Sequence, residues 1–75
     1  MLGYVMITLD SAKEQEIFDT LRDEKDIREV HILFGEWDMI VKLEIPSPEA
    51  LAQFVMEKIR PLAGVKYTST MIVAK

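Results

Sequence analysis

The stretch Ile27–Ile45, IREVHILFGEWDMIVKLEI, decides the fold because it holds two strand-like runs on either side of a glycine turn. Gly35-Glu36 fits a two-residue hairpin loop with glycine first, the type II′ pattern. The strand expected after the loop covers residues 37–45, and one of its faces is wholly apolar: Trp37, Met39, Val41, Leu43 and Ile45. The strand expected before the loop covers residues 27–34, with Val30, Ile32 and Phe34 on one face and Ile27, Glu29, His31 and Leu33 on the other.

The flanking segments add a strand and a helix on each side of this hairpin. Residues 2–9 form a nearly continuous apolar run that is too short for a helix and rich in strand formers. A helix should follow from Asp10-Ser11, with Ser11 and Glu14 at capping-box spacing. Ser47-Pro48 predicts the start of a second helix, because it pairs a cap residue with proline at the first helical position. The final strand is expected over residues 65–74.

The resulting order is β-α-β-β-α-β, which predicts an α+β, ferredoxin-like fold with a four-stranded antiparallel sheet and two helices on one face. Right-handed crossovers place the first and third strands in the middle of the sheet. A sheet with one helix-covered face usually shows polar residues on the other, yet here Tyr4 and Met6 interrupt that pattern. We therefore expect a second sheet to pack on the open face, as in a dimeric α+β barrel.

The composition favours a single small domain that associates with itself. The chain has 75 residues, no cysteine and 49% apolar residues, so a small core without disulfides would be completed by a second copy. The net charge of −4 and the scattered basic residues argue against direct binding of nucleic acid or of an anionic membrane. No membrane span or signal peptide is recognisable, which predicts a cytoplasmic location. The absence of Asn and Cys, with 29% charged residues, hints at a thermophilic source.

Three short patterns on this frame resemble one known family. They are Gly35-x-x-Asp38 with an aromatic residue between, Leu62-x-Gly64-Val65, and Thr68-x-Thr70-x-Ile72-Val73. In order and spacing they resemble the effector-binding (RAM) domain of the Lrp/AsnC, or feast/famine, transcription regulators over essentially the whole chain. The resemblance implies that residues 1–75 form a single ligand-binding and oligomerisation domain without a DNA-binding domain.

The resemblance also implies partners and a ligand site. Members of this family form homodimers and often rings of dimers, commonly octamers, and bind a free amino acid in pockets between dimers. Carried over by residue, the ligand site would contain Gly35, Trp37, Asp38, Thr68 and Thr70. Trp37 departs from the family, which usually has tyrosine there. A stand-alone module of this kind could also co-assemble with a full-length Lrp/AsnC regulator.

The residues carried over suit an amino acid chemically. Asp38 can pair with the ammonium group, while threonine hydroxyls and backbone N–H groups near Gly35 can bind the carboxylate. Trp37 offers an apolar wall and one N–H donor. Each residue also has a purely structural interpretation: Gly35 suits the turn, Asp38 suits a solvated strand start, Trp37 suits an interface, and the threonines are good strand formers.

Other classes of function fit less well. The fold is also used by small dimeric α+β barrel enzymes of monooxygenase type, for which His31 or Tyr67 could act inside a cavity. The sequence shows no nucleophile–base pair, no metal ligand set and no phosphate loop, so no catalytic residue, cofactor or metal is expected. RNA-recognition motifs share the topology but carry exposed aromatics among basic residues, and ACT domains carry a glycine-rich first loop that is missing after Leu9.

Overall fold

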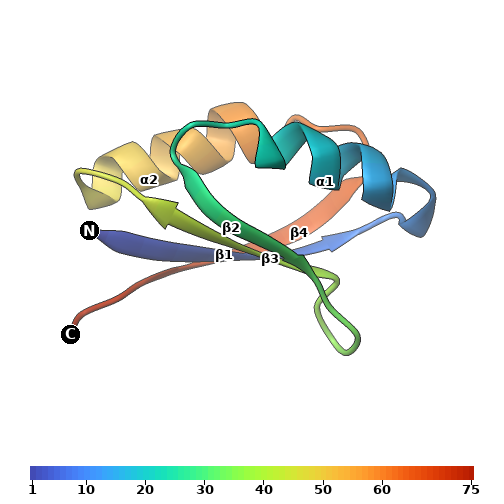
Figure 1. Ribbon diagram of the computed structural model, residues 1–75, viewed down its shortest axis with the longest axis horizontal. Coiled ribbons are helices and arrows are strands. Elements are labelled where there is room, and N and C mark those ends of the chain that lie inside the picture. Colours follow the sequence, from blue (N-terminus) through green and yellow to red (C-terminus); the bar gives the residue numbers. More distant parts are fainter.

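Four strands form one antiparallel sheet in the order β2-β3-β1-β4, and two helices lie across one of its faces (Figure 1). The computed structural model describes residues 1–75. The elements are β1 (Leu2–Leu9), a 3₁₀ turn (Ser11–Lys13), α1 (Glu14–Arg22), β2 (Ile27–Ile32), β3 (Met39–Glu44), α2 (Pro48–Phe54), a π-helical turn (Val55–Ile59) and β4 (Val65–Ile72). The predicted ferredoxin-like order is confirmed, with β1 and β3 in the middle of the sheet.

The core lies between the helices and the sheet. Along β1, Val5, Ile7 and Leu9 are buried against the helices, while the alternate side chains are half-buried on the opposite face. Along β3 the same alternation buries Met39, Val41 and Leu43. The opposite face has no element of the chain over it (Figure 1), and we call it the open face. Its members in β1 are Leu2, Tyr4, Met6 and Thr8.

Strand β2 departs from simple alternation. The pairing of β2 with β3 shifts register between Ile27 and Glu29, so Arg28 occupies a bulge. Ile27 and Val30 consequently both pack against the core, whereas His31 pairs with Ile40 on the open face. The prediction that Ile27 shares a face with His31 is therefore wrong, because a bulge reverses the alternation at one position.

The predicted N-terminal cap is present at α2 but not at α1. Ser47 caps α2, its hydroxyl accepting a hydrogen bond from the Ala50 N–H at 3.1 Å, with Pro48 at the first position. The predicted cap at Ser11 is wrong. Asp10 caps a 3₁₀ turn instead, its carboxylate accepting from the Ala12 N–H at 3.0 Å, and α1 begins only at Glu14.

A glycine in β1 lets α2 approach the sheet closely. A side-chain carbon added at Gly3 would lie 2.6 Å from Leu51 Cδ2 of α2. Leu51 is fully buried at this contact. Gly3 also pairs with Ile72, so the C-terminal end of β4 lies next to the place where α2 rests on the sheet.

Candidate functional site

The connection between β2 and β3 is longer than predicted. It comprises six residues, 33–38, in place of the expected two. Strand β2 therefore ends at Ile32, earlier than predicted, and strand β3 begins at Met39, later than predicted. The Leu33 N–H donates to the Asp38 carbonyl at 2.8 Å across the base of this loop. Gly35 has φ of 143°, a conformation that favours glycine, and Phe34 beside it is fully exposed. The prediction of a turn centred on Gly35 is right, but its length is wrong.

Asp38 ties this loop to the middle of the sheet. Its N–H donates to the Ile7 carbonyl at 2.9 Å, and its Oδ2 accepts from the Leu9 N–H at 2.9 Å. Its Oδ1 accepts no hydrogen bond from the chain. The side chain therefore has a structural role and still has one carboxylate oxygen available for a ligand.

Thr68 and Thr70 lie on the helix-covered side of β4, opposite Ile7 and Val5 of β1. They line a groove of about 320 Å³ between β4 and α2. The rest of the groove is mostly apolar and consists of Pro48, Leu51, Ala52, Val55, Met56, Arg60 and Ile72. The two threonine hydroxyls are thus polar groups on the wall of an apolar groove.

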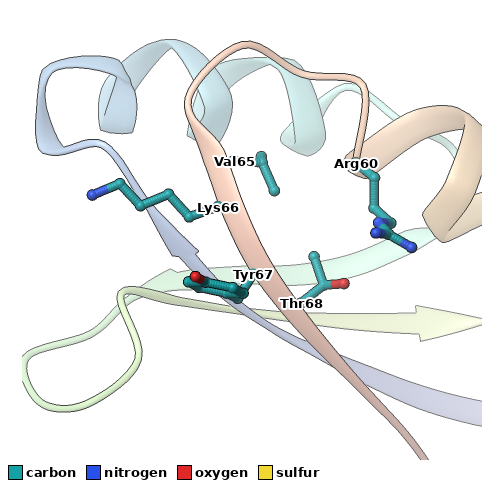
Figure 2. Close-up of a pocket in the computed structure, with 5 residues that line it drawn as sticks. All are labelled: Arg60, Val65, Lys66, Tyr67 and Thr68. Carbon is teal, nitrogen blue, oxygen red and sulfur yellow. The ribbon is translucent and has the colours of Figure 1, made fainter.

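A second hollow of about 280 Å³ adjoins the end of this groove. Arg60, Val65, Lys66, Tyr67 and Thr68 line it (Figure 2). Figure 2 shows the Thr68 hydroxyl on the side of β4 that faces the Arg60 guanidinium, while Lys66 extends in the opposite direction. Lys66 has no partner in β1, because the register shifts between Thr8 and Leu9.

The five residues of the predicted ligand site fall into two groups within one chain. Gly35, Trp37 and Asp38 belong to the loop, and no surface hollow is lined by any of them. Thr68 and Thr70 line the groove between β4 and α2, on the helix-covered side of the sheet. A single chain does not bring the two groups together in one pocket.

Arg60 is the residue of this region that sequence reasoning does not single out as a site residue. Its position in the last turn of the second helix, next to Pro61, is explained by the favourable interaction of a cation with a helix C-terminus. The only signal for a further role is its place in the chain, a short turn before the final strand.

A polar cluster occupies the β2 edge of the open face. Glu29 Oε1 lies 2.9 Å from His31 Nε2, and Lys42 Nζ donates to Glu29 Oε2 at 3.2 Å. Hydrogen bonds from His31 and Lys42, with the charge of Lys42, hold the pKa of the exposed Glu29 carboxyl below its usual value of 4.5. Glu29 also lines a small hollow of about 160 Å³, whereas His31 and Lys42 line none of the surface hollows.

Neither a metal centre nor a membrane span emerges from the fold. No group of three or more His, Asp or Glu side chains is arranged so that it could bind a metal ion. None of the helices has both the length and the apolar character needed to cross a bilayer.

Comparison with known proteins gives one consistent family. A model of the Lrp/AsnC ligand binding domain matches residues 2–75. The HTH-type transcriptional regulator FL11 of Pyrococcus abyssi is 35% identical over 75 residues, which cover all of this chain and 49% of that protein. The crystal structure of FFRP-DM1 matches with a TM-score of 0.89 and 33% identity over 96% of both chains. The structure of E. coli AsnC matches with a TM-score of 0.88 over 99% of this chain and 50% of that one, and at 24% identity it shows likeness of fold. The chain spans about half the length of the curated relatives it matches.

Proposed function

The chain belongs to the Lrp/AsnC family through its ligand-binding domain, and on that basis we propose that it binds a free amino acid as an effector. The relatives are named as transcriptional regulators, which disfavours the alternative of a small α+β barrel enzyme. A regulatory, effector-binding role is the function that the family supports.

We propose that the ligand site forms between two copies of the chain. The observation that carries this proposal is that, within one chain, Thr68 and Thr70 line the groove beside α2 while Gly35, Trp37 and Asp38 line no hollow. The loop of one copy, with Gly35, Trp37 and Asp38, would meet the groove of another copy, with Thr68 and Thr70. Each group alone lacks what an amino acid requires, since the groove has no carboxylate and the loop forms no hollow.

The roles within this site follow from charge and hydrogen bonding. The free Oδ1 of Asp38 would accept from the ligand ammonium group, while Oδ2 keeps its bond to Leu9. The hydroxyls of Thr68 and Thr70 would donate to the ligand carboxylate. Trp37 is half-buried and offers a wall for the ligand, and Gly35 leaves the backbone beside it accessible.

Self-association provides the setting for this site. The open face presents half-buried apolar side chains in β1, together with Tyr67 and Met71 of β4, which are 73% and 46% exposed. A second sheet packed there would bury them and form the homodimer. The fully exposed Phe34 gives the loop an apolar contact for further assembly into a ring such as an octamer.

The relation to DNA-binding regulators is a further part of the proposal. Because the chain matches about half of each regulator, it could co-assemble with a full-length family member through the same surfaces and alter that regulator's DNA affinity. In this scheme residues 1–75 act as a single ligand-binding and oligomerisation domain that does not contact DNA itself. Recovery of a full-length regulator with the tagged chain, lost on effector addition, would support the scheme.

Native mass spectrometry tests effector binding directly. The full chain at micromolar concentration is measured with and without each of the twenty amino acids. L-methionine is among them because a transcriptional regulator of Neisseria meningitidis, which has the same fold and is 21% identical, has been solved as its L-Met complex. We expect an oligomer that retains one amino acid or changes its stoichiometry with it. A strict monomer would contradict the proposal.

The role of Asp38 has a matched pair of variants. Asp38→Asn keeps an oxygen that can accept from Leu9 but removes the charge, so binding should fall by at least about tenfold while the fold is retained. Glu36→Gln removes the same charge from an exposed position in the same loop and should leave binding unchanged. Equal losses in both variants would mean that general electrostatics, and not Asp38, governs binding.

A further inference from the structure

The single histidine of the chain lies beside the apolar centre of the open face. His31 of β2 is paired with Ile40 of β3, and Ile40 is paired with Met6 of β1, so the three residues form one row across the sheet. The His31 side chain is 59% exposed in the single chain. A second copy that covers this row would therefore remove the imidazole from water.

The imidazole shares one carboxylate with a lysine. His31 Nε2 lies 2.9 Å from Glu29 Oε1, and Lys42 Nζ donates to Glu29 Oε2 at 3.2 Å. When the imidazole is neutral, the cluster holds one negative and one positive charge and is balanced. A proton on His31 leaves the cluster with one positive charge in excess. Covering that charge without a second anion is unfavourable, because desolvation disfavours an unpaired ion.

No second carboxylate of the chain is placed to balance the proton. Glu29 is the only acid within ion-pair distance of His31. Glu44, further along the open face of β3, pairs with the Met1 ammonium group at 3.6 Å. The other charged or titratable side chains on the elements around the cluster are Arg28 in the bulge of β2, Tyr4 and Tyr67 on the open face of β1 and β4, and Glu36 and Asp38 in the loop. A guanidinium would add to the excess positive charge, and phenols are uncharged near neutral pH.

Between about pH 7 and about pH 5.5 the cluster changes its charge at His31 alone, because imidazoles titrate in this range. A lysine ammonium group keeps its proton throughout it. Hydrogen bonds from His31 and Lys42 hold the pKa of the Glu29 carboxyl below its usual value of 4.5, so this group stays ionised. The open face therefore carries a balanced cluster at neutral pH and a positive cluster in mild acid.

We propose that His31 makes the association of two copies through the open face sensitive to acid, so that the assembly is stable when the imidazole is neutral and weakened when it is protonated. The inference rests on the proposed function for one element, the packing of a second sheet on this face. In a two-fold symmetric dimer the same face occurs on both copies, so each copy adds an excess charge in acid. For each proton released on association, the association constant falls about tenfold per pH unit below the titration range.

Sedimentation equilibrium of the full chain at about pH 7 and about pH 5.5, at constant ionic strength, tests the proposal. We expect the dissociation constant of the dimer to rise by about tenfold or more at the lower pH. His31→Gln keeps a polar side chain that cannot be protonated, so it should associate equally at both pH values. His31→Lys carries the charge permanently and should associate weakly at both. Urea midpoints measured at both pH values show whether each variant keeps its fold.

A histidine placed elsewhere provides the matched control. Gln53→His in the His31→Gln background puts an imidazole on the exposed side of α2, on the other side of the sheet from the open face. It changes the net charge in acid as His31 does, so its association should not depend on pH if position decides the effect. The terminal amino group, which titrates just above this range, is present in every variant, so its contribution appears in His31→Gln as well.

The outcomes distinguish this inference from the proposed function. An oligomer whose association is the same at both pH values, or a pH dependence that persists in His31→Gln, would overturn the inference and leave the proposed function standing. Tighter association in acid that is lost in His31→Gln would mean that the second copy supplies an anion to the imidazolium, and it would also overturn the inference. A strict monomer at both pH values would overturn the inference together with the self-association in the proposed function.

Discussion

The two faces of the sheet use the same strands in different ways. On the helix side, Val5 and Ile7 of β1 are completely buried within the chain. On the open face, Tyr4 and Met6 of the same strand are only half-buried, although they are similarly apolar. One chain therefore completes only one of the two apolar surfaces that β1 presents. The difference separates residues that hold the monomer together from residues available for assembly.

The open face is itself divided. Near the centre it carries Met6 paired with Ile40, whereas at the β2 edge it carries the Glu29–His31–Lys42 cluster. An apolar centre bordered by charges is the usual anatomy of a protein interface. We therefore expect the second copy to centre on β1 and β3.

The largest effect is expected when one side chain on each face of β3 is truncated and the two losses of stability are compared. Leu43→Ala removes a fully buried side chain from the helix side and should cost about 2–5 kcal/mol of unfolding free energy. Ile40→Ala, on the open face of the same strand, should cost distinctly less in a dilute monomer. Urea denaturation at low protein concentration measures both, and equal costs would contradict the division of the faces.

A charge on the open face should act on assembly and not on the fold. Met6→Lys places an ammonium group at the centre of the expected interface, so we predict a loss of roughly 2 kcal/mol or more in association, about thirtyfold. Light scattering coupled to size-exclusion chromatography would show the smaller species. Gln53→Lys adds the same charge on the exposed side of α2 and should leave the mass unchanged. An intact oligomer in Met6→Lys would place the interface elsewhere.

Two turn glycines, Gly64 and Gly35, differ in their surroundings, because Gly64 packs against the turn before α1 whereas Gly35 has no neighbouring side chain. Gly64 has φ of 101°, and an added side-chain carbon would lie 2.6 Å from Lys13 Cβ. Gly35 also has positive φ, but nothing lies within 4 Å of such a carbon. Gly64→Ala should therefore lower stability by about 1–3 kcal/mol, and Gly35→Ala should fall at the lower end of that range. Reversed denaturation midpoints would contradict this order.

The smallest expected effect concerns the charged edge of the open face. The lowered pKa of Glu29 means that the folded state favours its ionised form, so the contribution to stability is present above the unfolded pKa and is lost as pH falls through the folded pKa. Glu29→Gln should therefore lower the urea midpoint slightly at pH 7, where the contribution is fully present, and approach the parent chain as the pH falls below about 4.5, so that the acid dependence of the variant is weaker. Identical acid profiles for the variant and the parent chain would contradict the prediction.

Much of the fold could be predicted from local sequence. The apolar run of β1, the Ser47-Pro48 helix start and the alternation in β3 are short-range signals, and the structure contains each of them. Strand order followed from the handedness of the crossovers. Errors arose where distant backbone groups decide the outcome. The loop lengthened because Asp38 bonds to Ile7 and Leu9 of β1, which lie far away in sequence.

The candidate site was less predictable than the fold. The family resemblance supplied the five ligand residues, but only the structure showed that Thr68 and Thr70 share a groove with α2 while the loop residues stand apart. Arg60 carries no distinguishing signal in the sequence, because a cation at a helix C-terminus is common for electrostatic reasons. Arg60 lines a hollow together with residues of β4, and this proximity depends on how the helix packs against the sheet, which no local sequence pattern records.

Gly3 affects the shape of the groove between β4 and α2, although it does not line that groove. The missing side chain allows Leu51 to rest directly on β1, and Leu51 lines the groove between β4 and α2. The height of α2 above the sheet, and with it the width available to a ligand, is therefore set by a residue that no ligand would touch. An alanine at this position would require Leu51 to rotate or α2 to move away from the sheet, and either response would change the shape of the groove without changing any residue that lines it.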